Sequence, residues 1–374
     1  MATDEPTGTH PSADETGSGV AVAQRKFECP ACGGESHWNP GKRALICPYC
    51  GTESPAELQE RDDSTVIVEH DLVRALREVP DSARGWQADK VSVQCQSCKA
   101  ISVFDVAKIS QRCEFCGSTA LVPYEQVKES IRPESLLPMH ISEPQARDLI
   151  REWYGKQWLA PNNFAKKATT DTTRGIYLPY WTFDAQVHVV WSAERGDYYY
   201  TGSGKNRQRH TRWTSVHGEF DQFFDDDLVC ASMGVHQDLL RKVEPFPTTD
   251  SLVPYDAGYL SGWVVERYQI DLVTSAQRSR AQMDENIRKQ CVELIGGDTH
   301  RNLEVRSTYS GQTFKHILVP VWLLSYVYRS RPFQVVVNGA TGEVAGERPW
   351  SWIKIALLVL LALAILWGIN VLDS

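Results

Sequence analysis

LPYWTFDAQVHVVW (178–191) and VPVWLLSYVY (319–328) are the two stretches that decide the fold. Both are rich in β-branched and aromatic residues, which favours strands. Each follows a helical pattern and precedes a further strand-like stretch. We therefore interpret residues 124–347 as an α+β body of two related helix-plus-β-hairpin units, with chance recurrence of Pro-x-Trp as the alternative to an old duplication.

The two helices of this body carry their own boundary signals. Ser142 followed by Gln145 forms a capping box, so a helix is expected from there to about Trp158. A second helix is expected from about Ser275 to Leu294, because a Gly-Gly pair follows it.

Turn signals predict the hairpins that follow. Glu194-Arg195-Gly196 predicts a turn before the strand 197–201, and the strand 209–220 is its expected partner across a glycine-rich loop. Asn338-Gly339 predicts a later hairpin.

Eight of the ten cysteines form two blocks with the pattern C-x2-C-x14-C-x2-C. Two C-x2-C turns place four thiolates around one ion, which is the tetrahedral ligand set of structural Zn²⁺. Disulfides, redox dithiols and an iron–sulfur cluster are the alternatives; a chain without a secretory signal disfavours the first. The expected ligands are Cys29, Cys32, Cys47 and Cys50 in the first block and Cys95, Cys98, Cys113 and Cys116 in the second.

These blocks predict a tandem zinc-ribbon module over 27–123, with ribbons at 27–53 and 93–119 joined by a strand and a helix. Both sites are closed by four protein ligands, so the two Zn²⁺ ions are expected to be structural. Glycine follows three of the four knuckles, whereas Lys99 follows Cys98.

The two ends of the chain differ from the rest. Residues 1–26 are poor in large apolar side chains and are expected to form a disordered tail. Residues 350–372 are almost wholly apolar with Trp at both ends, which predicts a single C-terminal transmembrane anchor. Positive flanking residues before this segment place the bulk of the chain in the cytosol, with the bilayer contacted through 353–372.

The charge balance bears on the partner. The chain has 39 Lys and Arg against 47 Asp and Glu, a net charge of −8. This excess of acid disfavours a broad basic face for nucleic acid. Four thiolates around each Zn²⁺ make the ribbons still more negative.

Three features resemble reactive sites and are interpreted otherwise. Gly202-Ser203-Gly204-Lys205 lacks the remaining residues of a phosphate-binding loop, so we expect a hairpin loop. The acidic residues around Asp225 are expected to be solvated or ion-paired. Cys230 and Cys291 are expected to be buried, inert thiols. We find no catalytic constellation and expect no enzyme.

Several motifs together resemble a bacterial family of membrane-anchored zinc-ribbon proteins. They are CPACGG, CPYCG, GIYLPYWTFDA, TRWTSVHGEFDQFFDDDLVCAS, YLSGWVVERYQIDL and FQVVVNGATGEVAGERPWSWIKI. Members carry automatic labels such as transcription-factor-IIB-type zinc ribbon or primosomal helicase-like protein. The resemblance implies a tail-anchored protein of the cytoplasmic membrane, with phage-shock-type or flotillin-like partners in a membrane-stress complex.

The sequence therefore predicts a membrane-tethered, cytosol-facing zinc-ribbon adaptor that binds proteins. The alternatives are a zinc-ribbon nucleic-acid-binding protein and an enzyme with an unrecognised site in the α+β body.

Overall fold

The computed structural model describes most of the chain beyond the N-terminal tail. The described residues are 27–54, 67–76, 90–97, 99–105, 113, 115, 118, 121–123, 131–161, 173–202, 206–328 and 331–372. The expected disordered tail at 1–26 lies outside them.

Two sheets make up the strands of this part of the chain. The small sheet contains β1 (His37–Asn39), β2 (Ala44–Ile46) and β3 (Glu53–Ser54). The large sheet has twelve strands: β4 (His70–Asp71), β5 (Lys90–Cys95), β6 (Ile101–Asp105), β7 (Leu121–Pro123), β8 (Ser135–Leu136), β9 (Thr173–Thr201), β10 (Gln208–Cys230), β11 (Val253–Pro254), β12 (Val264–Glu266), β13 (Thr299–Tyr328), β14 (Arg331–Asn338) and β15 (Val344–Gly346).

The helices are few beside this sheet. They are α1 (Leu72–Ala75), α2 (Glu143–Gly155), α4 (Gln237–Val243), α5 (Thr248–Ser251), α6 (Leu272–Ile295) and α7 (Trp352–Leu372), with a 3-10 turn at Ala257–Leu260. Both expected body helices are confirmed. The capping box of Ser142 and Gln145 is present at the start of α2, and α6 ends at Gly296.

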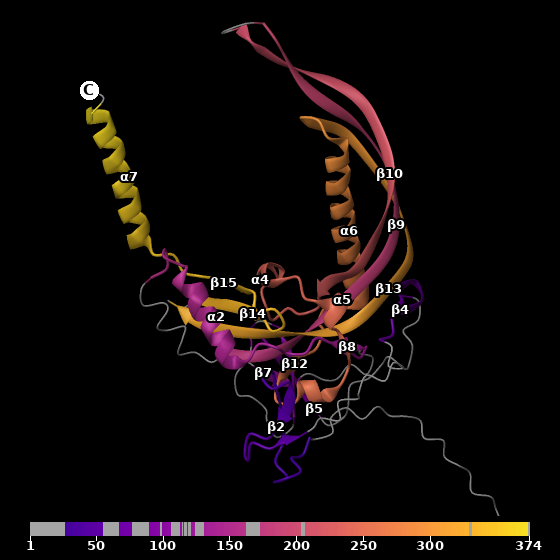
Figure 1. The fold of residues 1–374 in the computed structure, drawn as a ribbon, viewed down its shortest axis with the longest axis vertical. Coiled ribbons are helices and arrows are strands. Elements are labelled where there is room, and N and C mark those ends of the chain that lie inside the picture. Colours follow the sequence, from indigo (N-terminus) through magenta and orange to yellow (C-terminus); the bar gives the residue numbers. More distant parts are fainter. Residues whose placement is uncertain are drawn as a thin grey trace, which may run out of the picture.

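Three long strands, β10, β9 and β13, form a curved antiparallel arm that rises from the body (Figure 1). The helix α6 lies along its inner side. Met283, Ile287 and Cys291 on α6 are buried in one hydrophobic cluster with inward-facing residues of β9. This packing explains the strongly apolar sequence of 178–191, because β9 is covered on both faces near its start.

The predicted hairpin partners are confirmed, but one predicted turn is wrong. The strand 197–201 pairs with the start of β10, with Tyr198 opposite Thr211. However, Glu194-Arg195-Gly196 forms no turn, because β9 continues through it. Gly196 lies opposite Trp213 on one side and Thr299 on the other, so ladder bonds from both neighbouring strands hold it extended.

The two expected helix-plus-hairpin units share one sheet. The strands that follow α2 and α6 pair with each other, Tyr180 opposite Ile317, within one continuous sheet. The second cysteine block also belongs to this sheet, because β6 pairs with β12 and β5 pairs with β7.

The C-terminal membrane anchor is the main correction to the fold class. Among the residues that the structure describes, no helix is long and apolar enough to cross a bilayer. The transmembrane and tail-anchored assignments over 350–372, and the single-pass location in a cytoplasmic membrane, are therefore wrong. In Figure 1, α7 projects from the body beside α2.

Candidate metal centre

The first cysteine block converges on one point. One sulfur from each of Cys29, Cys32, Cys47 and Cys50 lies within 4.8 Å of every other. The Sγ atoms of Cys29 and Cys50 are 3.4 Å apart, and those of Cys32 and Cys47 are 3.5 Å apart. Zn–S bonds of about 2.3 Å in a tetrahedron require sulfur atoms roughly 3.8 Å apart. The cluster therefore has the donor set and nearly the spacing of a four-thiolate zinc site.

Backbone hydrogen bonds shape both knuckles of this site in the same way. The N–H of Cys29 donates to the Gly34 carbonyl at 2.6 Å, and the N–H of Gly33 donates to the Cys29 carbonyl at 2.8 Å. Cys47 and Gly51 repeat this pattern. Gly33 and Gly51 have φ of +70° and +72°, a conformation that favours glycine because it has no Cβ.

The environment of Cys50 favours the thiolate that a metal needs. Its Sγ lies 3.1 Å from Thr52 Oγ1. Hydrogen bonding to the Thr52 side chain and backbone lowers the pKa of the Cys50 thiol to about 6.

A buried tryptophan fixes the first ribbon to the body. Trp38 is 5% exposed, and its Nε1 donates to the Met139 carbonyl at 3.3 Å. Its ring meets Tyr259 edge-on at 4.6 Å. The Ser261 hydroxyl donates to the Ser36 carbonyl at 2.7 Å. The ribbon is therefore held on its inner side by contacts far apart in the sequence, which spacing alone did not predict.

The outer side of the same ribbon is open. Cys32 and Cys50 are exposed, while Cys29 and Cys47 are buried. Tyr49, between the last two cysteines, is 79% exposed, and its ring lies over Gly34. The ribbon thus presents a large aromatic side chain to solvent.

The second block is described in part. Cys98 and Cys116 lie outside the described residues, whereas Cys95 and Cys113 are both buried. The N–H of Cys95 donates to the Ala100 carbonyl, and the N–H of Lys99 donates to the Cys95 carbonyl, each at 2.9 Å. The knuckles of the first site make the same two backbone hydrogen bonds. Lys99 also has φ of +65°, so the lysine adopts the conformation that glycine adopts elsewhere.

The second block differs from the first in its packing. Phe115 is fully buried among residues of the body, beside Gly234 and Ala100. The hydroxyls of Ser97 and Ser118 hydrogen-bond at 2.8 Å, which ties the two knuckles together. This ribbon is part of the body's core.

A cluster of acidic side chains elsewhere in the body is neutralised by a lysine. Asp184, Asp225 and Asp226 come close enough to share an ion. However, Lys315 Nζ lies 2.8 Å from Asp226 Oδ1, with both side chains buried. The backbone N–H of Asp226 donates to Asp184. The ammonium group occupies the cation's place, so we interpret the cluster as an ion pair.

The two remaining thiols differ in burial, because Cys291 is buried and Cys230 is half-buried. Cys291 is fully buried in α6. Burial raises the pKa of the Cys230 thiol to about 12, so it stays protonated and unreactive at neutral pH.

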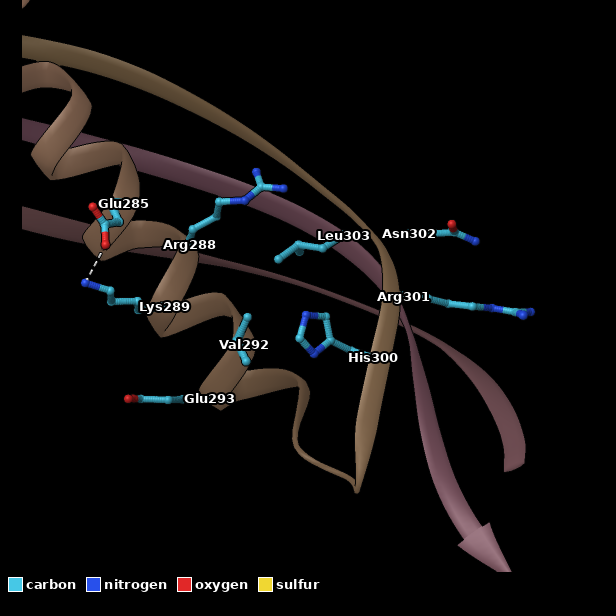
Figure 2. A pocket seen from close by; sticks show the side chains of 9 residues that line it. All are labelled: Glu285, Arg288, Lys289, Val292, Glu293, His300, Arg301, Asn302 and Leu303. Carbon is cyan, nitrogen blue, oxygen red and sulfur yellow. Dashed lines mark ion pairs between the residues drawn. The ribbon is translucent and has the colours of Figure 1, made fainter. Parts of the chain in front are cut away.

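One groove of about 700 Å³ lies between the end of α6 and the start of β13 (Figure 2). His300 and Leu303 point into it, whereas Arg301 and Asn302 point away. Lys289 pairs with Glu285 at 2.7 Å. Glu285 and Glu293 of its lining are two turns apart, so their Cα atoms differ by roughly 12 Å along the helix axis.

Comparison of the sequence with known proteins finds a distant relative. The chain is 25% identical over 252 residues to "Uncharacterized protein YdjG" of Bacillus subtilis (strain 168), which covers 63% of this chain and 70% of that protein. No family model matches the chain, and no solved structure matches it. The case for the metal centre therefore depends on the geometry of the four cysteines.

Proposed function

We propose that the chain is a non-enzymatic adaptor, in which two structural zinc ribbons support the binding of protein partners. One observation carries the proposal: the first four-cysteine cluster is fixed to the body on one side and exposes Tyr49 on the other. A rigid aromatic side chain on a fixed scaffold loses little entropy on binding, and Tyr is enriched at interface hot spots.

The second ribbon has a different task in this proposal. Its buried knuckles support the sheet, and its ligands are Cys95, Cys98, Cys113 and Cys116. The matching knuckle hydrogen bonds at Cys95 favour a second Zn²⁺ there. We expect two Zn²⁺ per chain.

The test is capture of partners by the tagged full-length chain, followed by identification of what is retained. Tyr49→Ser removes the exposed ring without touching a ligand, and Cys47→Ser with Cys50→Ser removes the first metal site. Trp158→Ser is the matched control, because Trp158 is 62% exposed but lies outside the ribbon.

We expect the same partner to be lost with Tyr49→Ser and with the double cysteine variant, and retained with Trp158→Ser. The Tyr49 variant should keep the zinc content of the wild type. A partner set that is identical for all four proteins would show that the ribbon is not the docking surface.

A further inference from the structure

The strand β10 is a long edge of the arm. Within the described part of the chain its 23 residues form ladder bonds with β9 alone. In the described part of the chain no strand pairs with the other edge of 208–222, whereas nearer the end of β10 the Leu228 carbonyl accepts a hydrogen bond from Gln282 of α6 at 3.4 Å. Such an edge is a template for a further strand.

The charges of β10 are divided along its length. Residues 208–217 contain Arg209 and Arg212 and no acid, whereas 218–227 contain five acids and no base. An antiparallel copy of the same strand would place the basic half of one chain beside the acidic half of the other. A parallel copy would place like charges together.

The side chains that would meet lie on the outer face. Phe220 and Phe224 point inward to the core cluster, so Asp221, one residue away, points outward. Its side chain is 68% exposed although its Oδ1 lies 2.8 Å from His188 Nδ1 on β9. Pairing with β9 is regular from Gln208 to Phe224, so Arg209 shares this outer face. Its guanidinium lies 4.3 Å from the centre of the Tyr198 ring.

We propose that β10 pairs with β10 of a second copy of this chain, antiparallel about a two-fold axis, to join the two arms in one sheet. A two-fold axis normal to the sheet keeps each face on its own side, so residues of the same face oppose each other. The axis passes between the two copies of Ser215. Arg209 of each copy then lies opposite Asp221 of the other copy, and Arg212 of each lies opposite Gly218 of the other.

This register pairs only the part of β10 that has regular pairing with β9. It pairs 208–222 of both copies, before the irregularity between Phe224 and Asp227. About one backbone hydrogen bond forms per residue pair, and the pair of Arg209–Asp221 contacts selects the orientation. The dimer presents two ribbons, so a multivalent partner would gain avidity.

The test is sedimentation of the full chain at several concentrations with two charge reversals, Arg209→Glu and Asp221→Lys. A homodimer of either variant has like charges at both 209–221 contacts. We therefore expect its dissociation constant to rise about tenfold. A 1:1 mixture restores opposite charges at both contacts and should form heterodimers of wild-type affinity. Arg212→Glu is the control, because it makes the same charge change opposite a glycine, and its affinity should stay within about twofold.

Three results would overturn the proposal. One is a wild-type chain that is monomeric over the whole concentration range. Another is a mixture no tighter than its components. The third is self-association that both reversals leave unchanged, which would place the contact on another surface, such as the exposed apolar side chains of α7.

Discussion

Lys99 shows at the residue scale how a knuckle tolerates an unfavourable side chain. Its φ of +65° matches the +70° of Gly33 and the +72° of Gly51, and its N–H makes the same bond to the first cysteine carbonyl. A left-handed conformation costs an L-residue about 1 kcal/mol or more. The hydrogen bond and the buried knuckle around it offset that cost.

Exchanging residues between the two blocks tests this account. Lys99→Gly should raise the free energy of unfolding by about 1 kcal/mol, because it removes the left-handed penalty. Gly51→Lys should lower it by a similar amount, since nothing lies within 4 Å of a Cβ at Gly51 and conformation alone changes. Denaturant unfolding of the zinc-loaded protein measures both. Equal stability of Gly51→Lys and wild type would contradict the argument.

His316 is the second residue with a measurable consequence. It is 1% exposed, its Nδ1 lies 2.9 Å from the Ile131 carbonyl oxygen, and its ring packs 4.8 Å from Trp181. Burial lowers the pKa of His316 to about 4. The folded chain therefore holds this imidazole neutral where the unfolded chain protonates it.

The sign of the pH dependence follows. Between about pH 6.5 and pH 4 the unfolded state binds the extra proton, so the free energy of unfolding falls as the pH falls, by up to about 3 kcal/mol. His316→Gln should lack this part of the slope, whereas the exposed control His217→Gln should keep it. Urea unfolding at pH 7, 6 and 5 measures the slope. A slope in His316→Gln equal to that of wild type would refute the assignment.

At the scale of elements, the sequence predicts local boundaries better than partners. The capping box of α2, the glycine that ends α6 and the cysteine knuckles depend on residues within a few positions of each other, and spacing reveals them. The pairing of β9 with β13 joins residues more than 100 positions apart, and a period of two does not name the partner strand. Glu194-Arg195-Gly196 stays extended because strand pairing on both sides outweighs its turn propensity.

The irregularity in β10 is an element-scale feature with a large expected energy. It includes Asp226, which is buried and pairs with Lys315 at 2.8 Å; Lys315 also pairs with Glu69 at 3.0 Å. The Lys315 side chain is 8% exposed. Removing one partner of a buried pair leaves the other charge uncompensated, which costs about 3–5 kcal/mol.

Lys315→Met should therefore lower the free energy of unfolding by about 3–5 kcal/mol. Adding Asp226→Asn to the same chain should recover part of the loss, because the uncompensated buried carboxylate is then removed. Denaturant unfolding of the single and double variants gives the coupling. A loss below about 1 kcal/mol in the single variant would show that the acids do not depend on the lysine.

At the scale of the whole molecule, the two cysteine blocks have unequal places although their spacing is identical. The first block enters a core cluster of the body through Trp38 and Leu45, but two of its cysteines are exposed. The second block places Cys95, Cys113 and Phe115 in a core cluster with Tyr180 and Ile317 of the long strands. Spacing predicts the ligand set, but the sheet decides what each metal site supports.

Loss of each metal should therefore have different consequences for the body. Cys47→Ser with Cys50→Ser releases one ribbon, so the main thermal transition should shift by only a few degrees. Cys95→Ser with Cys113→Ser replaces buried cysteine side chains in the core and loosens Phe115, so the same transition should fall by about 10 °C or more. Each pair should lower the zinc content by one equivalent. Calorimetry with zinc analysis measures both quantities, and equal shifts for the two pairs would mean that the first ribbon supports the sheet as much as the second.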